Sequence, residues 1–261
     1  MLCVYDEGAL EGTPLTGARG FSILIEADGE RTLFDTGLRG RYLIHNLDHL
    51  GVDTNTVDRV VISHGHRAHV GGLEAFLEKR EDMVEVIVTS DIEEAVLVKS
   101  LKTTMKRTGM PKLSDDALAK AVFKEISEWT QISDCLFITG SPKYKDGANR
   151  TAPAENSLVL MTRNGPVLVC GCCHHGLGRT MSYVVERTGK KVHAVVGGVH
   201  MTGLNKKEVY EVARIIKEDH SMPELYLNHC SGQTQIMHIR EKLGLKAVNE
   251  FYAGAEIRFG I

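Results

Sequence analysis

The feature that most constrains this chain is a strand-like apolar segment that ends in a histidine and precedes a helical segment, repeated four times. The first copy, residues 59–63, runs into His64. The other three are residues 167–170, 192–196 and 225–227, which lead to His174, His200 and His229. Strands that alternate with helices are typical of a layered α/β fold. We therefore expect four histidine-bearing strand ends to converge in space.

Two predicted β-hairpins open the two halves of the chain. Residues 21–26 and 31–35 flank a polar turn, and residues 158–162 and 167–170 flank the turn pair Asn164-Gly165. With the alternating strands and helices that follow, these hairpins predict two mixed β-sheets packed together, with helices outside.

Three other segments complete the predicted organisation. Apolar residues at helical spacing predict a helix over 40–50, and alternation predicts a closing strand over 251–259. Residues 91–128 lack strand alternation and are rich in Ala, Leu, Lys and Glu, so we expect a helical insertion there. No repeat or Pro/Gly-rich linker divides the sequence, which favours one domain over residues 1–261.

Composition excludes several classes of partner. The 261 residues include 31 Lys+Arg and 34 Asp+Glu, which gives a formal net charge of -3. The chain therefore has no excess of basic residues that could neutralise the phosphates of a nucleic acid. The N-terminal sequence lacks a secretion signal, and no apolar run approaches the roughly 20 residues of a membrane span. We expect a cytoplasmic protein without a membrane partner. Three of the six cysteines crowd together at 170–173, which argues against a disulfide framework.

The pattern H-x-H-x-x-H follows the first histidine-ended strand. In an extended segment residues i and i+2 share a face, so His64 and His66 can bind one metal ion, and His69 begins the next helix nearby. Neutral imidazole suits Zn, Fe, Mn and related ions. The alternative interpretation is that these histidines are merely solvated in a loop. Four histidine-bearing strand ends that converge favour the interpretation as metal ligands.

Five motifs resemble a known family. The segments FDTG at 34–37 and SHGHRAHVGG at 63–72 look like the metallo-β-lactamase superfamily. The segments GCCH at 171–174, GGVH at 197–200 and NHCSG at 228–232 resemble the branch of dihydropterin-methyl-(ribofuranosyl)aminobenzene phosphate synthases. The resemblance implies an α/β fold of the αββα sandwich type, with a metal site at one edge of the two sheets.

The resemblance also implies a ligand set for a divalent metal, with zinc favoured. His64, His66 and His174 would form the first site, and His69 and His229 would contribute to the second. His200 would be a bridging or accessory ligand, and Asp35 would orient the histidine loop through hydrogen bonds. His175 receives no role. The catalytic acid or base is expected among these three residues: His69, His200 and Asp35.

One position departs from the family pattern. The superfamily motif is H-x-H-x-D-H, and Ala68 stands where the aspartate would bind the second metal and accept a proton. The second site would then keep only neutral histidines. We expect either one ion or two ions with a different ligand set.

The cysteines near these histidines have two interpretations each. Cys172 and Cys173 precede His174, and a thiolate binds zinc well, but a buried cysteine at a strand end more often packs as a small apolar residue. We expect packing for both. Cys230, beside His229, is the better candidate for a contact with metal or substrate.

Weaker signals concern a phosphorylated substrate. Ser231-Gly232 opens a predicted helix and could hold a phosphate or could be an ordinary serine cap. Four basic residues could neutralise phosphate or could simply be solvated: Arg67, Lys143, Lys145 and Arg150. Trp129 could stack on a heterocycle, although packing is the commoner role for a single tryptophan.

Three functions remain open at this point. The first is a synthase in which the metal assists departure of pyrophosphate from a pterin methyl carbon while an aminobenzene partner attacks. The second is a metal-dependent hydrolase of a small phosphoester or lactone, which would suffer from the loss of the aspartate at position 68. The third is a non-catalytic binder of a metal or metabolite, and the five candidate ligands argue against it. In the first two cases the partner is a small molecule, expected to be phosphorylated.

Overall fold

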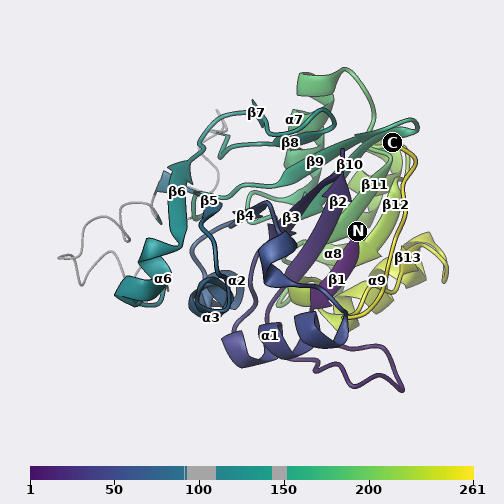
Figure 1. Ribbon diagram of the computed structural model, residues 1–261. Helices are drawn as coiled ribbons and strands as arrows, with labels where there is room; N and C mark the ends of the chain where they lie inside the picture. Colours follow the sequence, from purple (N-terminus) through teal and green to yellow (C-terminus); the bar gives the residue numbers. More distant parts are fainter. Residues whose placement is uncertain (91, 93–109, 143–151) are drawn as a thin grey trace.

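Two β-sheets packed face to face form the centre of the protein, and helices cover their outer faces (Figure 1). The computed structural model describes residues 1–90, 92, 110–142 and 152–261. This arrangement confirms the predicted αββα sandwich of two mixed sheets. The prediction of a single domain stays a prediction.

The first sheet has six strands in sequence order. They are β1 (Leu2–Tyr5), β2 (Ser22–Ala27), β3 (Glu30–Phe34), β4 (Arg59–Val61), β5 (Val84–Val88) and β6 (Ala121–Glu125). The antiparallel pair β2–β3 is the predicted hairpin, and β3 to β6 pair in parallel. The carboxyl end of β4 leads into the segment that carries His64, His66 and His69.

The second sheet has seven strands in the order β13-β12-β11-β10-β9-β8-β7. In chain order they are β7 (Thr130–Gln131), β8 (Leu136–Ile138), β9 (Leu158–Thr162), β10 (Gly165–Cys170), β11 (Ala194–Gly197), β12 (Glu224–Leu227) and β13 (Val248–Asn249). The predicted hairpin is β9–β10, and β10 to β13 run parallel. The carboxyl ends of β10, β11 and β12 therefore meet at one edge of the sheet.

The helices lie in two outer layers. The first sheet is accompanied by α1 (Gly40–His49), α2 (Arg67–Val70), α3 (Leu73–Glu78) and α6 (Asp115–Ala119), with a 3₁₀ turn η1 (Thr54–Thr56). The second is covered by α7 (Leu177–Thr188), α8 (Lys206–Arg214) and α9 (Gln233–Leu243), with a π-helical turn η2 (Ile215–Asp219) and a 3₁₀ turn η3 (His229–Ser231). The predicted helix over 40–50 and the helices expected after the histidine-bearing strand ends are therefore present.

Three buried clusters correspond to the three interfaces between these layers. The cluster between the sheets contains Phe21, Phe34 and Val196, and a second cluster joins the first sheet to α1 and α3. The third joins the second sheet to α7, α8 and α9 through residues such as Met181 and Ile236. Burial of apolar area on both faces of each sheet stabilises the sandwich and holds its edges in register.

Two predicted elements are wrong. Within the proposed helical insertion 91–128, Ser114 does cap the helix α6, but Ala121–Glu125 forms the edge strand β6 along the whole of β5. The sequence AVFKE is short and half exposed, so its strand pattern was weak. Residues 91 and 93–109 of that insertion lie outside the described residues. The expected closing strand 251–259 is not a strand of either sheet. Its residues 253–257 pair with the first ten residues of the chain through backbone hydrogen bonds and two isolated bridges, Leu2 with Glu256 and Ala9 with Ala253.

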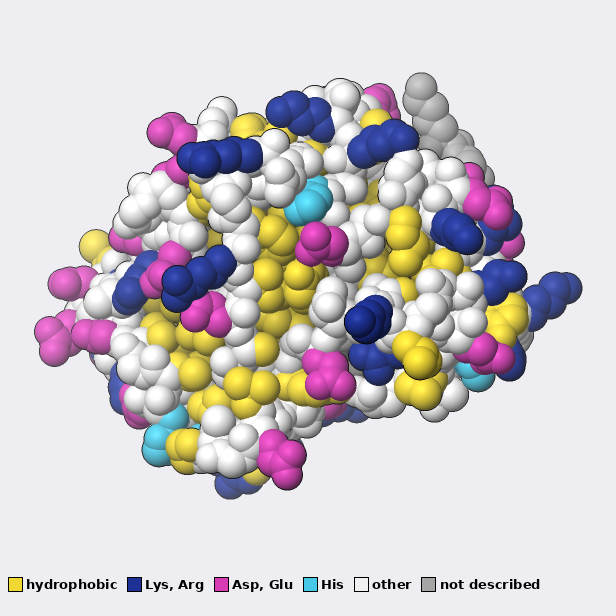
Figure 2. Space-filling model, turned by 90° about the vertical axis from the view of Figure 1, so that its right-hand side faces the viewer, with side chains coloured by type: hydrophobic (Ala, Val, Ile, Leu, Met, Phe, Trp, Pro, Cys, Tyr) yellow, Lys and Arg dark blue, Asp and Glu magenta, His cyan; other side chains and the backbone are white. Residues whose placement is uncertain are grey.

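The surface agrees with the nearly balanced charge. Figure 2 shows the face of the molecule on the side of β12, β13 and the two chain ends, where hydrophobic side chains occupy the middle. Basic and acidic side chains are interspersed around them on this face, without one continuous basic patch. No helix among the described residues is long and apolar enough to span a bilayer.

Candidate metal centre

Four strand ends bring the histidines together at one edge of the sandwich. His64 follows β4 of the first sheet, while His174, His200 and His229 follow β10, β11 and β12 of the second. His69 lies in the short helix α2, which begins one residue after His66. The predicted convergence of histidine-bearing strand ends is therefore present in the structure.

The first histidine group joins the two sheets. Nε2 of His64 lies 3.0 Å from Nδ1 of His66 and 3.2 Å from Nε2 of His174, which is 110 residues away in sequence. The His64 ring is buried, whereas His66 is exposed and His174 is half-buried. Three ring nitrogens that face one another across such short distances form a ready set of metal donors.

The second group pairs His69 with His229. Their Nε2 atoms are 3.2 Å apart, although the residues are separated by 160 positions in the sequence. The His69 ring centroid is also 4.2 Å from that of His64, so the two groups are neighbours. The structure thus brings together all five predicted ligands, and their role as ligands remains a proposal.

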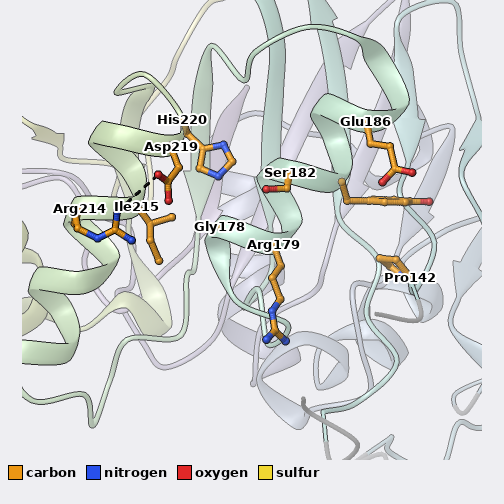
Figure 3. A pocket seen from close by; sticks show the side chains of 10 residues that line it. Pro142, Gly178, Arg179, Ser182, Glu186, Arg214, Ile215, Asp219 and His220 are labelled. Atoms are coloured by element: carbon orange, nitrogen blue, oxygen red, sulfur yellow. Dashed lines mark ion pairs between the residues drawn. The ribbon is translucent and has the colours of Figure 1, made fainter. Parts of the chain in front are cut away.

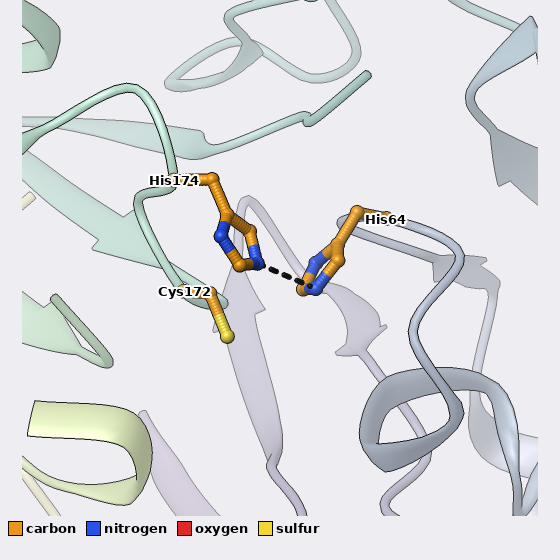
Figure 4. Close-up of side chains that lie close together, drawn as sticks. All are labelled: His64, Cys172 and His174. Carbon is orange, nitrogen blue, oxygen red and sulfur yellow. Dashed lines mark hydrogen bonds between the residues drawn. The ribbon is translucent and has the colours of Figure 1, made fainter. Parts of the chain in front are cut away.

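Cys172 lies between the two groups. Its Sγ atom is 3.2 Å from Nε2 of His69, and together with His229 these ligand atoms lie within 4.8 Å of one another. The same sulfur belongs to a group with His64 and His174 at the same spacing, and Figure 4 shows their side chains converging. The expectation that Cys172 only packs in the apolar core is therefore wrong as to its location. Cys172 and Cys173 cannot be told apart from the sequence, because both follow the same strand end.

The other two cysteines lie as expected. Cys173 is buried in the apolar cluster over the second sheet, and its sulfur lies 3.3 Å from Oγ1 of Thr180. Cys230 forms a third group with Cys172 and His200, and its sulfur accepts the backbone N–H of His200 at 3.2 Å. Cys230 is thus at the rim of the centre.

Asp35 and Ser63 hold the histidine loop from behind. Oδ2 of Asp35 lies 2.6 Å from Nδ1 of His69 and accepts the Ser63 hydroxyl at 2.7 Å, while Oδ1 accepts the Ser63 backbone N–H at 2.7 Å. The Ser63 hydroxyl oxygen is also 2.9 Å from Nδ1 of His64. Because Nδ1 of His64 and of His69 is engaged in this way, Nε2 of each ring faces the candidate metal centre. Burial raises the pKa of Asp35 to about 8, although the Ser63 hydrogen bonds oppose the shift.

Three acidic residues at the centre were missed by the sequence reasoning. Glu155 is buried, and its carboxylate accepts the backbone N–H groups of Cys172, Cys173 and His174 at 2.6–3.1 Å. Burial raises the pKa of Glu155 to about 8. Glu155 lies in a polar stretch of the sequence without a recognisable motif, so no local pattern indicates its role.

The other two missed residues support His229 from the N-terminus. Oε1 of Glu7 lies 3.0 Å from Nδ1 of His229, and Oδ1 of Asp6 accepts its backbone N–H at 2.9 Å. A carboxylate behind a histidine fixes the ring and strengthens its free nitrogen as a ligand. More than 200 residues separate these partners, so no local pattern could reveal them.

The electrostatic state of the rings suits metal binding. Burial lowers the pKa of His64 and His69 well below the ordinary value, and it lowers the pKa of His174 to about 3. These rings are therefore neutral, with a lone pair available. Burial also lowers the pKa of His229, but the hydrogen bond to Glu7 and nearby acidic groups outweigh it and raise the pKa overall.

The pKa values of the two sulfurs at the centre are shifted from the ordinary value of a thiol. Burial raises the pKa of Cys230, but contacts with Cys172 and His200 outweigh it and lower the pKa to about 5. The contact with Cys230 raises the pKa of Cys172 strongly. The two pKa shifts have opposite directions, and the contact between the two sulfurs contributes to both.

The backbone at the centre is unusual. Four residues there that are not glycine have a positive φ: Asp35 at 62°, Cys173 at 58°, His200 at 42° and His229 at 47°. This left-handed region is unfavourable for residues with a side chain and is concentrated at functional sites in proteins. The turns it produces direct consecutive side chains in directions that a strand or a helix would not allow.

The remaining candidates lie as follows. The ring of His200 is 4.3 Å from that of His174 and faces the exterior. Ser231 does not cap α9, whose N-cap is Gly232; its hydroxyl instead accepts the backbone N–H of Val199. Trp129 packs against Phe137 and Tyr183.

Of the four basic candidates, only Arg67 belongs to the part of the chain that the structure describes. Arg67 is exposed in the short helix α2. Lys143, Lys145 and Arg150 lie outside the described residues.

The two packed sheets and the histidine-rich edge define a protein with the metallo-β-lactamase fold. The chain is similar to the 7,8-dihydropterin-6-methyl-4-(β-D-ribofuranosyl)-aminobenzene-5'-phosphate synthase of Methanocaldococcus jannaschii, with 24% identity over 245 residues. This alignment covers 84% of this chain and 83% of that protein. The family model described as anti-Pycsar protein Apyc1 matches residues 20–137.

Solved structures support the same fold. A structure described as a metal-dependent hydrolase of the β-lactamase superfamily, Tm1679, has a TM-score of 0.76 and 22% identity, covering 100% of this chain and 98% of the other. The metallo-β-lactamase fold protein YhfI from Bacillus subtilis has a TM-score of 0.60 and 14% identity, covering 96% of each chain.

Proposed function

We propose that this protein is a metal-dependent enzyme that joins two small molecules, one of them phosphorylated, in a reaction of the kind named for its synthase relative. The observation that carries the proposal is the position of Cys172, whose sulfur is within reach of both histidine groups. A thiolate there would replace the anionic ligand that Ala68 does not provide.

The donor set fits a divalent metal, and zinc best. The first ion would be held by these residues: His64, His66, His174 and Cys172. The second would be held by His69, His229 and the same cysteine. Imidazole and thiolate are the preferred ligands of zinc, and the carboxylates behind the rings are the usual support for such ligands. A zinc ion, when bound, supplies Lewis acidity that stabilises the charge of a departing phosphate group.

The absence of a carboxylate from the donor groups favours condensation over hydrolysis. Among the described residues, the three groups whose ligand atoms converge contain only histidine and cysteine. Asp35, Glu155 and Glu7 are directed at ring nitrogens or backbone N–H groups behind the centre. Activation of water by a hydrolase benefits from a positioned carboxylate base. Departure of pyrophosphate from an activated carbon needs no such group.

In the proposed reaction a carbon–oxygen bond breaks and a carbon–nitrogen bond forms. Pyrophosphate leaves the pterin methyl carbon with the bonding electrons, and the nitrogen of the aromatic amine donates its lone pair to that carbon. The nitrogen then loses a proton. The ring of His200, exposed at the rim and 4.3 Å from the ring of His174, is the group we assign to accept it.

The test supplies zinc-loaded protein with 6-hydroxymethyl-7,8-dihydropterin pyrophosphate and 4-(β-D-ribofuranosyl)aminobenzene 5'-phosphate. We expect pyrophosphate release that depends on the amine and that is lost in His64→Ala. The variant His238→Ala, which changes a histidine on α9 paired with Glu241, is the matched control and should keep activity. Turnover of a generic phosphodiester or lactone, with no amine-dependent release, would instead support the hydrolase.

A further inference from the structure

A third group of donor atoms lies at the rim of the candidate metal centre. It consists of the sulfurs of Cys172 and Cys230 and a ring nitrogen of His200, which all lie within 4.8 Å of one another. We call it the rim group. The proposed zinc ligands include Cys172 but neither Cys230 nor His200. The rim group therefore has two donors of its own and shares the third with the zinc positions.

Hydrogen bonds between two strand ends hold Cys230 against His200. The backbone N–H of His200 donates to the sulfur of Cys230 at 3.2 Å. The backbone N–H and the hydroxyl of Thr202 both donate to the carbonyl oxygen of Cys230, at 3.1 and 2.9 Å. The hydroxyl of Ser231 accepts the backbone N–H of Val199 at 3.2 Å. These four bonds join the segment after β11 to the segment after β12, so the backbones of two of the three donors are fixed before any ion binds.

Gly198 makes room for the sulfur of Cys230. A Cβ atom at position 198 would lie 2.7 Å from that sulfur and 2.3 Å from the carbonyl oxygen of Gly171. The sulfur of Cys230 also lies 3.7 Å from the carbonyl oxygen of Cys172, to which its S–H donates. The close packing of the ends of β10, β11 and β12 therefore places the two sulfurs side by side.

Two sulfurs and one imidazole form a soft donor set. Such ligands select copper(I), zinc and similar ions, whereas magnesium and calcium require oxygen ligands. Among the described residues, no carboxylate belongs to the group. A zinc ion would have to complete its usual four ligands with water, whereas three ligands are sufficient for copper(I). Two thiolates also carry enough negative charge for a monovalent ion. Copper(I) is therefore the ion that matches the rim group best.

The rim group is accessible from one side. His200 is exposed and Cys230 is half-buried, whereas Cys172 is buried. His200 also lines a cavity of about 420 Å³ together with His174 and Met201. An ion can thus reach the two outer donors first and the buried sulfur last.

We propose that Cys172, His200 and Cys230 form a copper(I) site at the rim of the zinc centre. The ion arrives as copper(I), so no electron is transferred, and each sulfur that is still protonated releases its proton to water when it binds the ion. Occupation of this site takes Cys172 away from both zinc positions and covers the ring of His200. Copper(I) would therefore inhibit the proposed reaction. This consequence rests on the proposed function, whereas the copper site does not.

The test titrates chelator-treated, full-length protein with copper(I) in the absence of oxygen, in competition with bicinchoninate, a chelating dye. We expect at least one ion per chain to be taken from the dye. Cys230→Ser replaces a soft sulfur by a hard oxygen of similar size. The affinity for copper(I) should fall at least about tenfold, the lower limit even for residues that only support a ligand. The zinc content of this variant should stay unchanged, because Cys230 is not a proposed zinc ligand.

Two variants serve as matched controls. Cys135→Ala removes a buried thiol outside the donor groups and should bind copper(I) as the unchanged protein does. His200→Gln should weaken the binding of copper(I). His220→Gln should not, because His220 lines a different cavity, between α7 and η2 (Figure 3), and belongs to no donor group. X-ray absorption should show sulfur ligands at the copper in the unchanged protein.

Four results would overturn the proposal. The first is an unchanged protein that takes no copper(I) from the dye, and the second is a Cys230→Ser variant that binds copper(I) equally well. The third is an equal loss of copper(I) in either control variant or a parallel loss of zinc in Cys230→Ser. The fourth is a copper ion with nitrogen ligands alone.

The two proposals can fail separately. Copper(I) binding through Cys230 without amine-dependent pyrophosphate release would remove the proposed function and leave the site. Amine-dependent release by a protein whose copper(I) affinity does not depend on Cys230 would remove the site and leave the function.

Discussion

The sulfur of Cys172 lies 3.2 Å from Nε2 of His69, although 103 residues separate the two in sequence. This contact crosses from the second sheet to the first. Since the same sulfur is grouped with His64 and His174, Cys172 is common to both histidine groups. A single thiolate at this point would place one negative charge within reach of both proposed metal positions.

Cys172→Ala should therefore lower bound zinc to at most one ion per chain, and the remaining ion should be held more weakly. Elemental analysis after gel filtration measures the stoichiometry. Cys135→Ala, a buried thiol before β8 and outside the three donor groups, is the control and should leave zinc content unchanged. Equal zinc content in the two variants would mean that Cys172 only packs.

Asp35→Asn should weaken zinc binding by about 10–100-fold, the usual effect of removing a carboxylate behind a metal-binding histidine. The amide retains an oxygen that can accept a hydrogen bond from Nδ1 of His69, but it lacks the negative charge that strengthens a metal-bound imidazole. Competition with a chelating dye measures the affinity. Asp48→Asn, an exposed aspartate paired with Lys79, serves for comparison. Identical zinc affinities for both variants would show that Asp35 holds the histidine loop but does not contribute to metal binding.

Acid should destabilise the metal-free protein through its histidines. An unfolded histidine takes up a proton near pH 6.5, whereas burial lowers the pKa of His174 to about 3 in the folded state. The unfolded chain then binds more protons between these values, so this residue's contribution to stability is lost as the pH falls from 6.5 toward 3. The raised pKa values of Asp35 and Glu155, about 8 each, act in the opposite direction over the same range. The sign is therefore tested by comparing urea denaturation between pH 4 and 7 for the unchanged protein and for a variant without His174.

His174→Gln should reduce that slope by less than the roughly 1.4 kcal/mol per pH unit that one full proton contributes. His45→Gln, a histidine of α1 away from the centre, should leave the slope as it is. A slope insensitive to both changes would contradict the assignment of His174 as a neutral buried ring.

Ala68→Asp should add an anionic ligand near the second histidine group and raise bound metal toward two ions per chain. For a hydrolase, turnover of phosphoester or lactone would also rise by about 10²–10⁴, the usual contribution of a positioned acid or base. For the synthase, metal content would rise with little change in rate. Unchanged stoichiometry and activity would show that position 68 does not face the second group.

Much of the fold could be predicted because the relevant signals are local. The hairpin β9–β10 follows from alternation around Asn164-Gly165, and the helix α8 begins after Asn205, which forms a capping box with Glu208. The strand β6 could not be found in the same way. Its pairing with β5 depends on a partner 37 residues away, and its own alternation is short.

The candidate ligands were similarly accessible where a motif is contiguous. His64, His66 and His69 share one loop. Glu7 and Glu155 carry no such mark, because each acts through a partner on another element. The location of Cys172 at the centre could not be predicted for the same reason, because its neighbours His64 and His229 follow β4 and β12.

Four residues of the centre have positive φ angles, which lower the stability of the fold while they orient side chains for the proposed chemistry: Asp35, Cys173, His200 and His229. Each left-handed residue with a side chain costs about 1 kcal/mol or more, which glycine would avoid. A mutant library filtered only for heat resistance would therefore accumulate glycine at these positions. A library filtered for turnover would keep the strained residues, so the two lineages would diverge first around this centre.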